Sequence, residues 1–167
     1  MTERTTVTYL EMTDPGRLRP AAEVPGLELV PAEAASSLVR AVLTRVAAPY
    51  GWAVAEWTDA QWADWTARPG LRHWLLTLDG AEVGVVQALP EPGGAVQITK
   101  FGLVPEAVGR GLGGHALTLA LRAAWSLRPR DAVRVRRVRL HTCTRDHPHA
   151  LPNYRARGMS VTRTEVR

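Results

Sequence analysis

Five of the sixteen residues from Gly102 to Leu117 are glycine, and they lead directly into an apolar segment. Glycine costs roughly 1 kcal/mol relative to alanine inside a helix, so a glycine cluster at a helix start needs a specific reason. The first N–H groups of a helix have no partner within it, and the helix dipole adds partial positive charge there. The segment therefore predicts a turn in which main-chain amides bind an anion such as a phosphate ester.

Strand and helix signals alternate on both sides of this turn. Asp79-Gly80 between two apolar runs predicts a tight hairpin, and a third antiparallel strand is expected to follow it. The order strand, helix, strand after the hairpin predicts a parallel crossover. Strands are expected at residues 5–12, 27–30, 72–78, 82–89, 95–104, 134–142 and 160–166, and helices at 31–46, 58–68, 112–127 and 147–157. The chain is therefore expected to form one mixed α/β domain over residues 1–167.

The two helices expected before the hairpin have distinct signals. The first has Pro31 in its first turn and apolar residues at i, i+3, i+4 and i+7, namely Val39, Val42, Leu43 and Val46. The second begins at Thr58 and has Gln61 three residues later, which is the spacing of a capping box. Both segments are therefore expected to be helices with one buried face.

Composition limits the class of protein. Hydrophobic residues make up 46% of the 167 residues and charged residues 22%, which suits one globular core. No apolar run approaches the ~18 residues of a membrane span, and the first residues lack the order of a signal peptide. The single cysteine, Cys143, cannot form an internal disulfide, so we expect a cytoplasmic protein without a membrane partner. No Cys/His spacing resembles a zinc site, so no metal is expected.

Positive charge is concentrated toward the C-terminal end. From Arg122 onward twelve arginines face three acidic residues, and lysine occurs once in the whole chain against twenty arginines. Such a segment could bind nucleic acid. However, "RVRRVRL" reads as a strand whose valines need a core, and it lacks the interleaved aromatic residues of a stacking surface. We therefore expect a solvated basic surface and no nucleic-acid partner.

Two common phosphate-binding loops do not fit the glycine segment. A Walker loop ends in Gly-Lys-Ser/Thr, whereas "GLGGHA" has neither lysine nor hydroxyl. A dinucleotide loop follows a parallel strand near the start of a βαβ unit, whereas three antiparallel strands are expected here. The segment instead resembles the acyl-coenzyme A loop of the GNAT superfamily of N-acetyltransferases, Gln/Arg-x-x-Gly-x-Gly/Ala, read here from Val108 to Gly113. Val108 departs from that pattern, and the preceding Val104-Pro105-Glu106 is typical of it.

A second motif carries the same resemblance. The family often has Asn-x-x-Ala-x-x-Leu/Phe-Tyr followed by Gly-Phe, and "TCTRDHPHALPNYRARGM" is similar to it. The corresponding residues here are His147, Ala150, Asn153, Tyr154, Gly158 and Met159. A branch of the superfamily with "FGL-PE" and "HTCT-DHP-ALPNY" segments matches still more closely.

The resemblance implies a GNAT fold, a mostly antiparallel sheet with splayed strands and about four flanking helices. It also implies an acetyl-CoA-dependent N-acetyltransferase acting on a small or amino-acid-like amine, and a homodimer. By resemblance, acetyl-CoA lies in the opening of the splayed strand. The implied cofactor-binding residues are Phe101, Gly102, Leu103, Val104, Val108, Gly109, Arg110, Gly111, Leu112, Gly113, Gly114, His147 and Asn153.

Acetyl transfer to an amine needs a neutral nucleophile and a proton for the departing thiolate. The resemblance makes Tyr154 the acid, since a phenol is protonated at neutral pH. Where many members have a glutamate base, this chain has Gln97, which can position a water or an amine but cannot hold a proton. His141, Asp146 and His147 are alternative bases. A water chain without a dedicated base is a further alternative.

The acceptor is expected near the region between the first two helices. Four tryptophans occur there within fourteen residues, and they could enclose a cationic amine. The ordinary alternative is that they dock a short helix on the core. The candidate acceptor residues are Trp52, Glu56, Trp57, Trp62, Thr99 and His141.

A second reading of the whole chain is a GNAT-fold module that binds acyl-coenzyme A without efficient catalysis, as a sensor or interaction partner. The missing glutamate favours this alternative, and Tyr154 disfavours it.

Overall fold

In the computed structural model, residues 3–33 and 35–167 are described, and they contain seven strands in one sheet together with four α-helices. The strand order is β2-β3-β4-β5-β6-β1-β7. The strands are β1 (Thr6–Met12), β2 (Leu27–Ala32), β3 (Arg72–Leu78), β4 (Ala81–Glu91), β5 (Ala95–Leu103), β6 (Arg137–Cys143) and β7 (Ser160–Val166). The helices are α1 (Ser37–Ala47), α2 (Asp59–Thr66), α3 (Gly113–Trp125) and α4 (Ala150–Ala156). This mixed sheet confirms the expected fold class.

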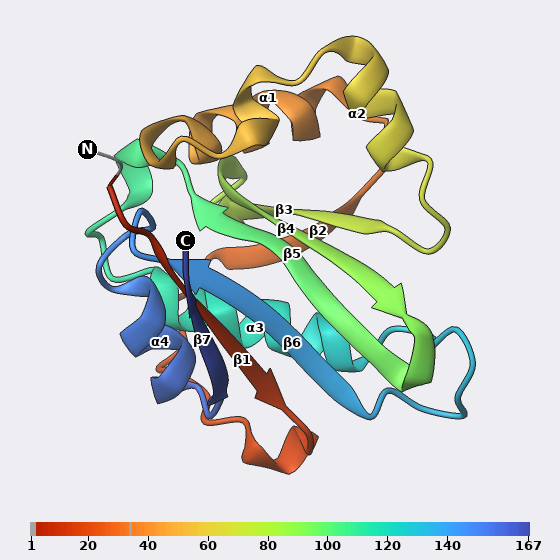
Figure 1. The fold of residues 1–167 in the computed structure, drawn as a ribbon. Helices are drawn as coiled ribbons and strands as arrows, with labels where there is room; N and C mark the ends of the chain where they lie inside the picture. Colours follow the sequence, from red (N-terminus) through yellow and green to blue (C-terminus); the bar gives the residue numbers. More distant parts are fainter. Residues whose placement is uncertain (1–2, 34) are drawn as a thin grey trace.

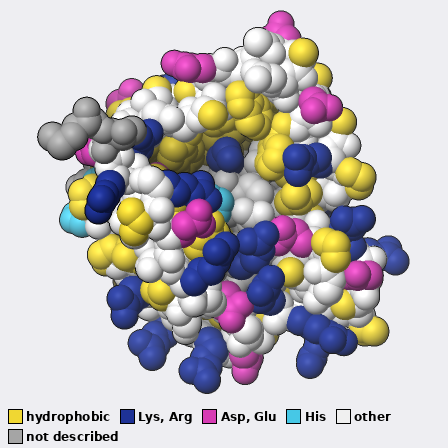
Figure 2. Space-filling model, viewed as in Figure 1, with side chains coloured by type: hydrophobic (Ala, Val, Ile, Leu, Met, Phe, Trp, Pro, Cys, Tyr) yellow, Lys and Arg dark blue, Asp and Glu magenta, His cyan; other side chains and the backbone are white. Residues whose placement is uncertain are grey.

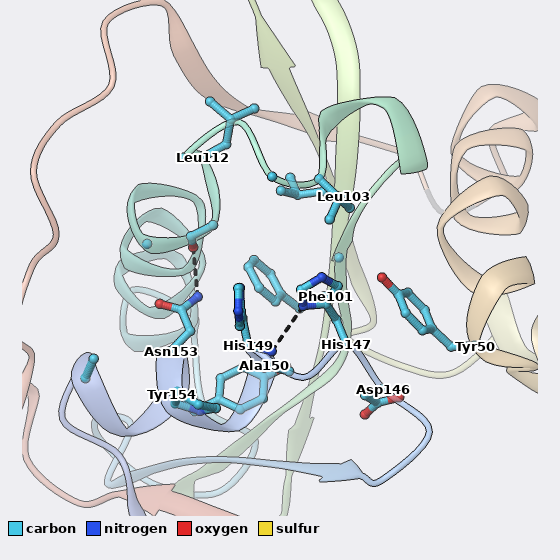
Figure 3. A pocket seen from close by; sticks show the side chains of 18 of the residues that line it. Tyr50, Phe101, Leu103, Leu112, Asp146, His147, His149, Ala150, Asn153 and Tyr154 are labelled. Carbon is cyan, nitrogen blue, oxygen red and sulfur yellow. Dashed lines mark hydrogen bonds between the residues drawn. The ribbon is translucent and has the colours of Figure 1, made fainter.

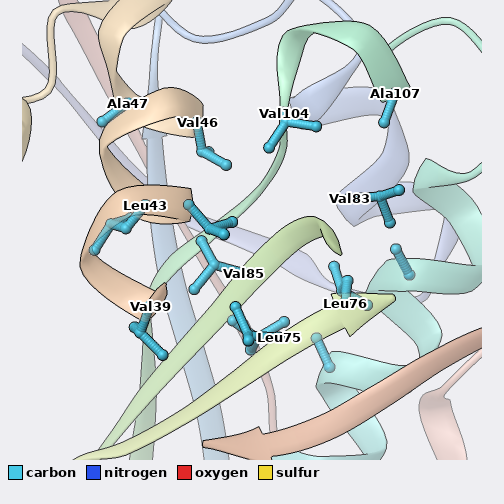
Figure 4. Packing of buried hydrophobic residues seen from close by; sticks show 14 of the residues in the cluster. Val39, Leu43, Val46, Ala47, Leu75, Leu76, Val83, Val85, Val104 and Ala107 are labelled. Carbon is cyan, nitrogen blue, oxygen red and sulfur yellow. The ribbon is translucent and has the colours of Figure 1, made fainter. Parts of the chain in front are cut away.

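The helices cover both faces of the sheet. Helices α1 and α2 lie on one side, and α3 and α4 lie on the other (Figure 1). Figure 4 shows side chains of α1 directed toward β3 and β4, where Val39, Leu43 and Val46 pack near Val85. Each of these four valines and leucines is completely buried. The helical apolar stripe predicted from the sequence is therefore confirmed as the core-facing side of α1.

The start of α1 differs from the prediction. Pro31 belongs to β2, where it pairs with Trp74, and the helix begins six residues later at Ser37. Ser36 caps it, because its Oγ accepts a hydrogen bond of 3.4 Å from the Val39 N–H. Pro31 is tolerated because β2 is at the edge of the sheet, where a missing N–H breaks no ladder bond.

The other local predictions hold more closely. The capping box at the start of α2 is present, with Thr58 and Gln61 bonding each other's backbone. The hairpin turn at Asp79-Gly80 has positive φ at both residues, 51° and 85°. Between α1 and α2 the chain forms a short 3₁₀ turn at Ala53–Glu56.

Strands β5 and β6 separate soon after they meet. They are parallel, joined by the crossover through α3, and only three residue pairs connect them: Ala95 with Arg137, Val96 with Val138, and Gln97 with Arg139. Both strands continue for several residues beyond these pairs. The facing edges of β5 and β6 are therefore unpaired beyond Gln97, and the sheet opens there.

The first strand of the chain lies far from its sequence neighbours. Strand β1 runs between β6 and β7 and is antiparallel to both. Thr5 and Arg167 exchange two backbone hydrogen bonds of 2.9 and 2.8 Å, so the described ends of the chain lie side by side (Figure 1). Strand β1 thereby supports β6 on the side opposite the opening.

No helix within residues 3–33 and 35–167 is long and apolar enough to span a membrane.

Candidate functional site

A cavity of about 480 Å³ occupies the opening between the end of β5, the glycine loop and α4 (Figure 3). Its walls come from segments far apart in the sequence. The lining residues are Tyr50, Trp52, Phe101, Gly102, Leu103, Val108, Gly109, Gly111, Leu112, Gly113, Gly114, Asp146, His147, His149, Ala150, Pro152, Asn153, Tyr154 and Ala156. We call this space the large cavity.

The glycine loop turns its backbone toward the large cavity. Gly109 and Gly111 have φ of 80° and 77°, a conformation that other residues rarely adopt. A Cβ at either position would meet no atom within 4 Å, so the backbone is accessible. No side chain caps α3, which begins at Gly113. Its first N–H groups are therefore available to an anion, as predicted from the sequence.

Two side chains of the α4 region fix and charge the start of α3. Asn153 Nδ2 donates a hydrogen bond of 3.0 Å to the Gly113 carbonyl oxygen (Figure 3). Arg157 lies so close to Gly114 that an added Cβ would be 2.6 Å from its Nη1. Asn153 therefore sets the position of the loop, and Arg157 adds a cation beside the amides.

Tyr154 of α4 is a buried residue that lines the large cavity. The side chain is 7% exposed, and its ring meets Phe101 edge-on at a centroid distance of 6.4 Å. Burial, and secondarily the charge of Asp146, raise the pKa of Tyr154 above its usual value. The hydroxyl therefore remains a proton donor at any physiological pH.

Asp146 connects the loop after α1 to the loop after β6. Its Oδ1 accepts a hydrogen bond of 2.9 Å from Trp52 Nε1, and its Oδ2 accepts bonds of 2.6 and 3.0 Å from Thr142 Oγ1 and the Cys143 N–H. A carboxylate with three such donors has its orientation fixed. Because Asp146 and Trp52 come from opposite sides of the opening, this pair holds the two sides at a set separation.

A second, smaller cavity of about 160 Å³ lies between β5 and β6. It shares Trp52, Phe101, Asp146 and Tyr154 with the large cavity. Its other lining residues are Ile98, Thr99, Lys100, Leu140, His141 and Cys143. We call this second space the small cavity. The surface of the molecule is hollowed between α1–α2 and the sheet, with hydrophobic side chains along the helical wall and Lys and Arg side chains below (Figure 2).

Two basic side chains of the small cavity, Lys100 and His141, have lowered pKa values. Burial lowers the pKa of the Lys100 ammonium. Partial burial, and then the charges of Lys100 and Arg139, lower the pKa of His141 below its usual value. The His141 imidazole is therefore neutral at pH 7 and able to accept a proton.

A buried polar network holds the strand segment at Thr99. Thr99 is an extra residue in β5, since Gln87 and Ala88 of β4 pair with Lys100 and Ile98. Its Oγ1 donates a hydrogen bond of 2.7 Å to Gln87 Oε1, which also accepts one of 2.9 Å from Trp65 Nε1. A bulge bends its strand locally, and this one lies two residues after the last pair between β5 and β6.

The structure brings most of the predicted cofactor residues together. Of that set, all but two line the large cavity, and the exceptions are Val104 and Arg110. Val104 is 3% exposed and packs in the core, while its N–H bonds the Val83 carbonyl oxygen at 2.8 Å. Arg110 is exposed between the two positive-φ glycines. Neither side chain reaches the wall of the cavity.

Gln97 is not brought to either cavity. It belongs to the last residue pair that joins β5 to β6, before the strands separate. Its Oε1 accepts a hydrogen bond of 3.4 Å from Arg139, whose guanidinium is paired with Glu91. The proposed positioning role of Gln97 stays a prediction, and its geometry fits a support for Arg139 instead.

Of the predicted acceptor residues, Trp52, Thr99 and His141 line the small cavity. Glu56, Trp57 and Trp62 line neither cavity. Trp62 is 7% exposed in the core, and Trp57 packs against it at 6.4 Å between ring centroids. These residues form no cage on the cavity wall, because docking α2 on the sheet uses their surfaces.

Sequence reasoning did not select Lys100, Tyr50 or His149, which also line the cavities. A signal for Lys100 was present, since it is the single lysine of an arginine-rich chain. Tyr50 and His149 carry no such signal, because they reach the site through turns whose course depends on packing.

Comparison with known proteins identifies the family and the fold of the chain. The family model described as "Acetyltransferase (GNAT) family" matches residues 39–159. No curated protein matches the sequence. Among solved structures, a functionally unknown conserved protein from Staphylococcus epidermidis is 14% identical, with a TM-score of 0.68 over 98% of this chain and 60% of its own. A GCN5-related N-acetyltransferase from Kribbella flavida is 19% identical, with a TM-score of 0.63 over 98% of this chain and 56% of its own.

The chain thus spans less than two thirds of the length of these solved proteins. Their identities are low, and their likeness establishes the fold. All the residues that line the two cavities, from Tyr50 to Ala156, fall within the matched residues 39–159. The chain belongs to the GNAT acetyltransferase family.

Proposed function

We propose that this protein is an N-acetyltransferase that transfers the acetyl group of acetyl-CoA to the primary amine of a small or amino-acid-like molecule. The observation that carries the proposal is the separation of β5 from β6 after Gln97, which opens a cavity between an uncapped, glycine-lined helix start and Tyr154. Family membership supports acyl transfer as the reaction class.

The residues present fit acetyl-CoA. The amides from Gly109 to Gly114 would hold the diphosphate, with Arg157 as an additional cation near Gly114. The unpaired edge of β5 at Phe101 to Leu103 would bond the amides of the pantetheine arm. When bound, acetyl-CoA supplies an activated thioester whose sulfur leaves as a thiolate.

Tyr154 is the proposed acid. Its phenol lines both cavities, and its raised pKa keeps the proton available for the departing sulfur. His141 is the proposed acceptor of the amine proton, since it lines the small cavity as a neutral imidazole. Asp146 would attract the ammonium form of the acceptor toward the wall that both cavities share.

The expected partner is a small amine and not a nucleic acid. Two arginines of β6 pair with acidic side chains, Arg139 with Glu91 at 2.5 Å and Arg137 with Glu11 at 3.3 Å. Such pairing reduces the cationic surface that a phosphate backbone would need.

The test is thiol release from acetyl-CoA with a panel of small amines, run beside thermal unfolding with and without coenzyme A. Amine-dependent thiol release together with stabilisation by coenzyme A is the expected result. Stabilisation without turnover of any amine would favour the alternative, an acyl-CoA-binding sensor. Absence of both effects at millimolar coenzyme A would overturn the assignment, and salt-sensitive retention on DNA would point to nucleic-acid binding.

A further inference from the structure

The small cavity continues from the large cavity across one shared wall. Trp52, Phe101, Asp146 and Tyr154 belong to both cavities. A molecule in the small cavity would therefore contact an acyl group in the large cavity beside Tyr154, one of the shared residues. Its far end must lie among the remaining lining residues of β5 and β6, which include Lys100.

Lys100 is placed in the small cavity without a partner of opposite charge. Its Nζ donates one hydrogen bond, of 3.3 Å, to the neutral carbonyl oxygen of Thr99. No carboxylate in residues 3–33 or 35–167 forms an ion pair with it. An ammonium has three N–H donors, so two donors remain for a ligand. A half-buried cation without a counter-ion is costly, and the Trp65 ring, whose centroid is 5.7 Å from Nζ, offsets part of that cost without supplying a negative charge.

Lys100 is the cation of this region that keeps its charge unpaired. The charges of Lys100, Arg139 and Arg167 all act on His141, but Arg139 and Arg167 are paired with Glu91 and Glu165. The oxygens of Asp146 already accept hydrogen bonds from Trp52, Thr142 and Cys143. Asp146 therefore stays at the shared wall, and it does not neutralise Lys100.

The cation and the carboxylate thus stand at different parts of one cavity. Asp146 and Tyr154 mark the wall where the amine must react, and Lys100 lies on the side of β5. A volume of about 160 Å³ is close to that of an engineered cavity that holds benzene. The site therefore suits a compact molecule with a positive group at one end and a negative group at the other.

We propose that the acceptor is a small amino acid or amino acid-like acid, and that Lys100 binds its carboxylate while the amine faces Tyr154 and Asp146. This inference rests on the proposed N-acetyltransferase function and narrows its substrate class. A diamine or a simple alkylamine would leave Lys100 unpaired beside a second cation or an apolar group. Lys100 is accordingly a residue that determines specificity and has no part in the proton transfers.

The test compares glycine, β-alanine and 4-aminobutyrate with their carboxamides as acceptors, in the wild type and in Lys100→Met and Lys100→Arg. The wild type is expected to prefer at least one acid over its amide in kcat/KM by about tenfold or more, the factor of one charge-assisted hydrogen bond. Lys100→Met is expected to remove that preference by raising KM for the acid, with little change for the amide. Lys100→Arg is expected to keep most of the preference, because it retains the charge.

A second measurement tests the contact between Lys100 and the carboxylate by binding, without catalysis. Calorimetric titration of the protein with coenzyme A and the N-acetylated acid is expected to show binding that Lys100→Met weakens and Lys100→Arg retains. Equal use of acids and amides, or equal losses on both in Lys100→Met, would overturn the inference and leave the proposed function standing. Coenzyme A binding with no acceptor turned over and no binding of any N-acetylated acid would overturn both.

Discussion

The indole Nε1 of Trp52 donates a hydrogen bond of 2.9 Å to Oδ1 of Asp146, ninety-four residues further along the chain. This bond joins the turn after α1 to the loop between β6 and α4, and both residues line both cavities. The width of the opening between β5 and β6 therefore depends on one polar contact as well as on packing.

The Trp52–Asp146 bond is expected to stabilise the folded protein measurably. In a double-mutant cycle of Trp52→Phe and Asp146→Asn, the coupling free energy is expected to be about 1–2 kcal/mol, because the acceptor is charged. Urea unfolding followed by circular dichroism measures it. Additive losses in the double variant would mean that the contact contributes nothing to stability.

Tyr154→Phe is expected to lower kcat by about 10²-fold or more, as loss of a general acid does, with coenzyme A binding little changed. The pKa of Tyr154 is raised, so the phenol stays protonated and its ionisation should not limit activity below pH 10. Tyr50→Phe is the matched control, since it removes a hydroxyl from another wall of the large cavity (Figure 3). Equal losses in both variants would argue against an acid role for Tyr154.

Alanine at Gly109 or Gly111 is expected to cost about 1–2 kcal/mol of stability each, because both residues have positive φ. The same variants should weaken coenzyme A binding, since the backbone that meets the diphosphate changes shape. Gly113→Ala is the control, because its added Cβ would make only an ordinary contact of 3.7 Å with Asn153 Nδ2. Calorimetry with coenzyme A measures the difference, and unchanged affinity in all three variants would place the diphosphate elsewhere.

Gly102→Ala is expected to destabilise the protein by about 1–3 kcal/mol. An added Cβ would lie 2.5 Å from Val46 Cγ1, where α1 packs on β5. Val46→Ala in the same chain removes the clash, so the double variant should lose less than the sum of the single changes. Thermal unfolding of the four proteins gives the comparison. Additive losses would show that the two positions do not meet.

His73 is expected to make stability depend on pH. Burial lowers its pKa to about 4 from 6.5, and its Nε2 meets the Gln87 amide Nε2 at 2.5 Å as an acceptor. Below pH 6.5, His73 binds a proton in the unfolded chain but stays neutral in the folded protein. The free energy of unfolding should therefore fall as the pH drops from about 6.5 to about 4. The total loss is about 3 kcal/mol. Urea unfolding at several pH values should show this slope in the wild type, and His73→Gln should flatten it.

Local signals in the sequence were enough for most of the fold. The capping box at Thr58, the Asp79-Gly80 turn and the apolar stripe of α1 each depend on residues within a few positions of one another. The glycine loop before α3 was likewise predicted, because glycine is the residue type that favours positive φ and cannot cap a helix with a side chain. The start of α1 was placed six residues too early, since Pro31 suits an edge strand as well as a helix, and the starts of β6 and α4 were each placed three residues too early.

The sequence motifs led to residues of one cavity, and residues brought there by packing were missed. Apart from Arg110, the residues from Val108 to Gly114 line the large cavity together with Asn153 and Tyr154. Gln97 was selected because it stands where many members of the family have a glutamate, but that correspondence does not tell at which residue two parallel strands separate. That point is fixed by the three pairs between β5 and β6 and by the bulge at Thr99.

The sequence by itself determined the class of fold, the glycine loop before α3 and the family, because these follow from short-range patterns of residue type. The tertiary structure alone decided that β1 lies between β6 and β7, that Trp52 bonds Asp146, and that Lys100 stands in a cavity beside Tyr154. These relationships join residues dozens of positions apart. They arise from how the sheet twists and opens, which no local pattern encodes.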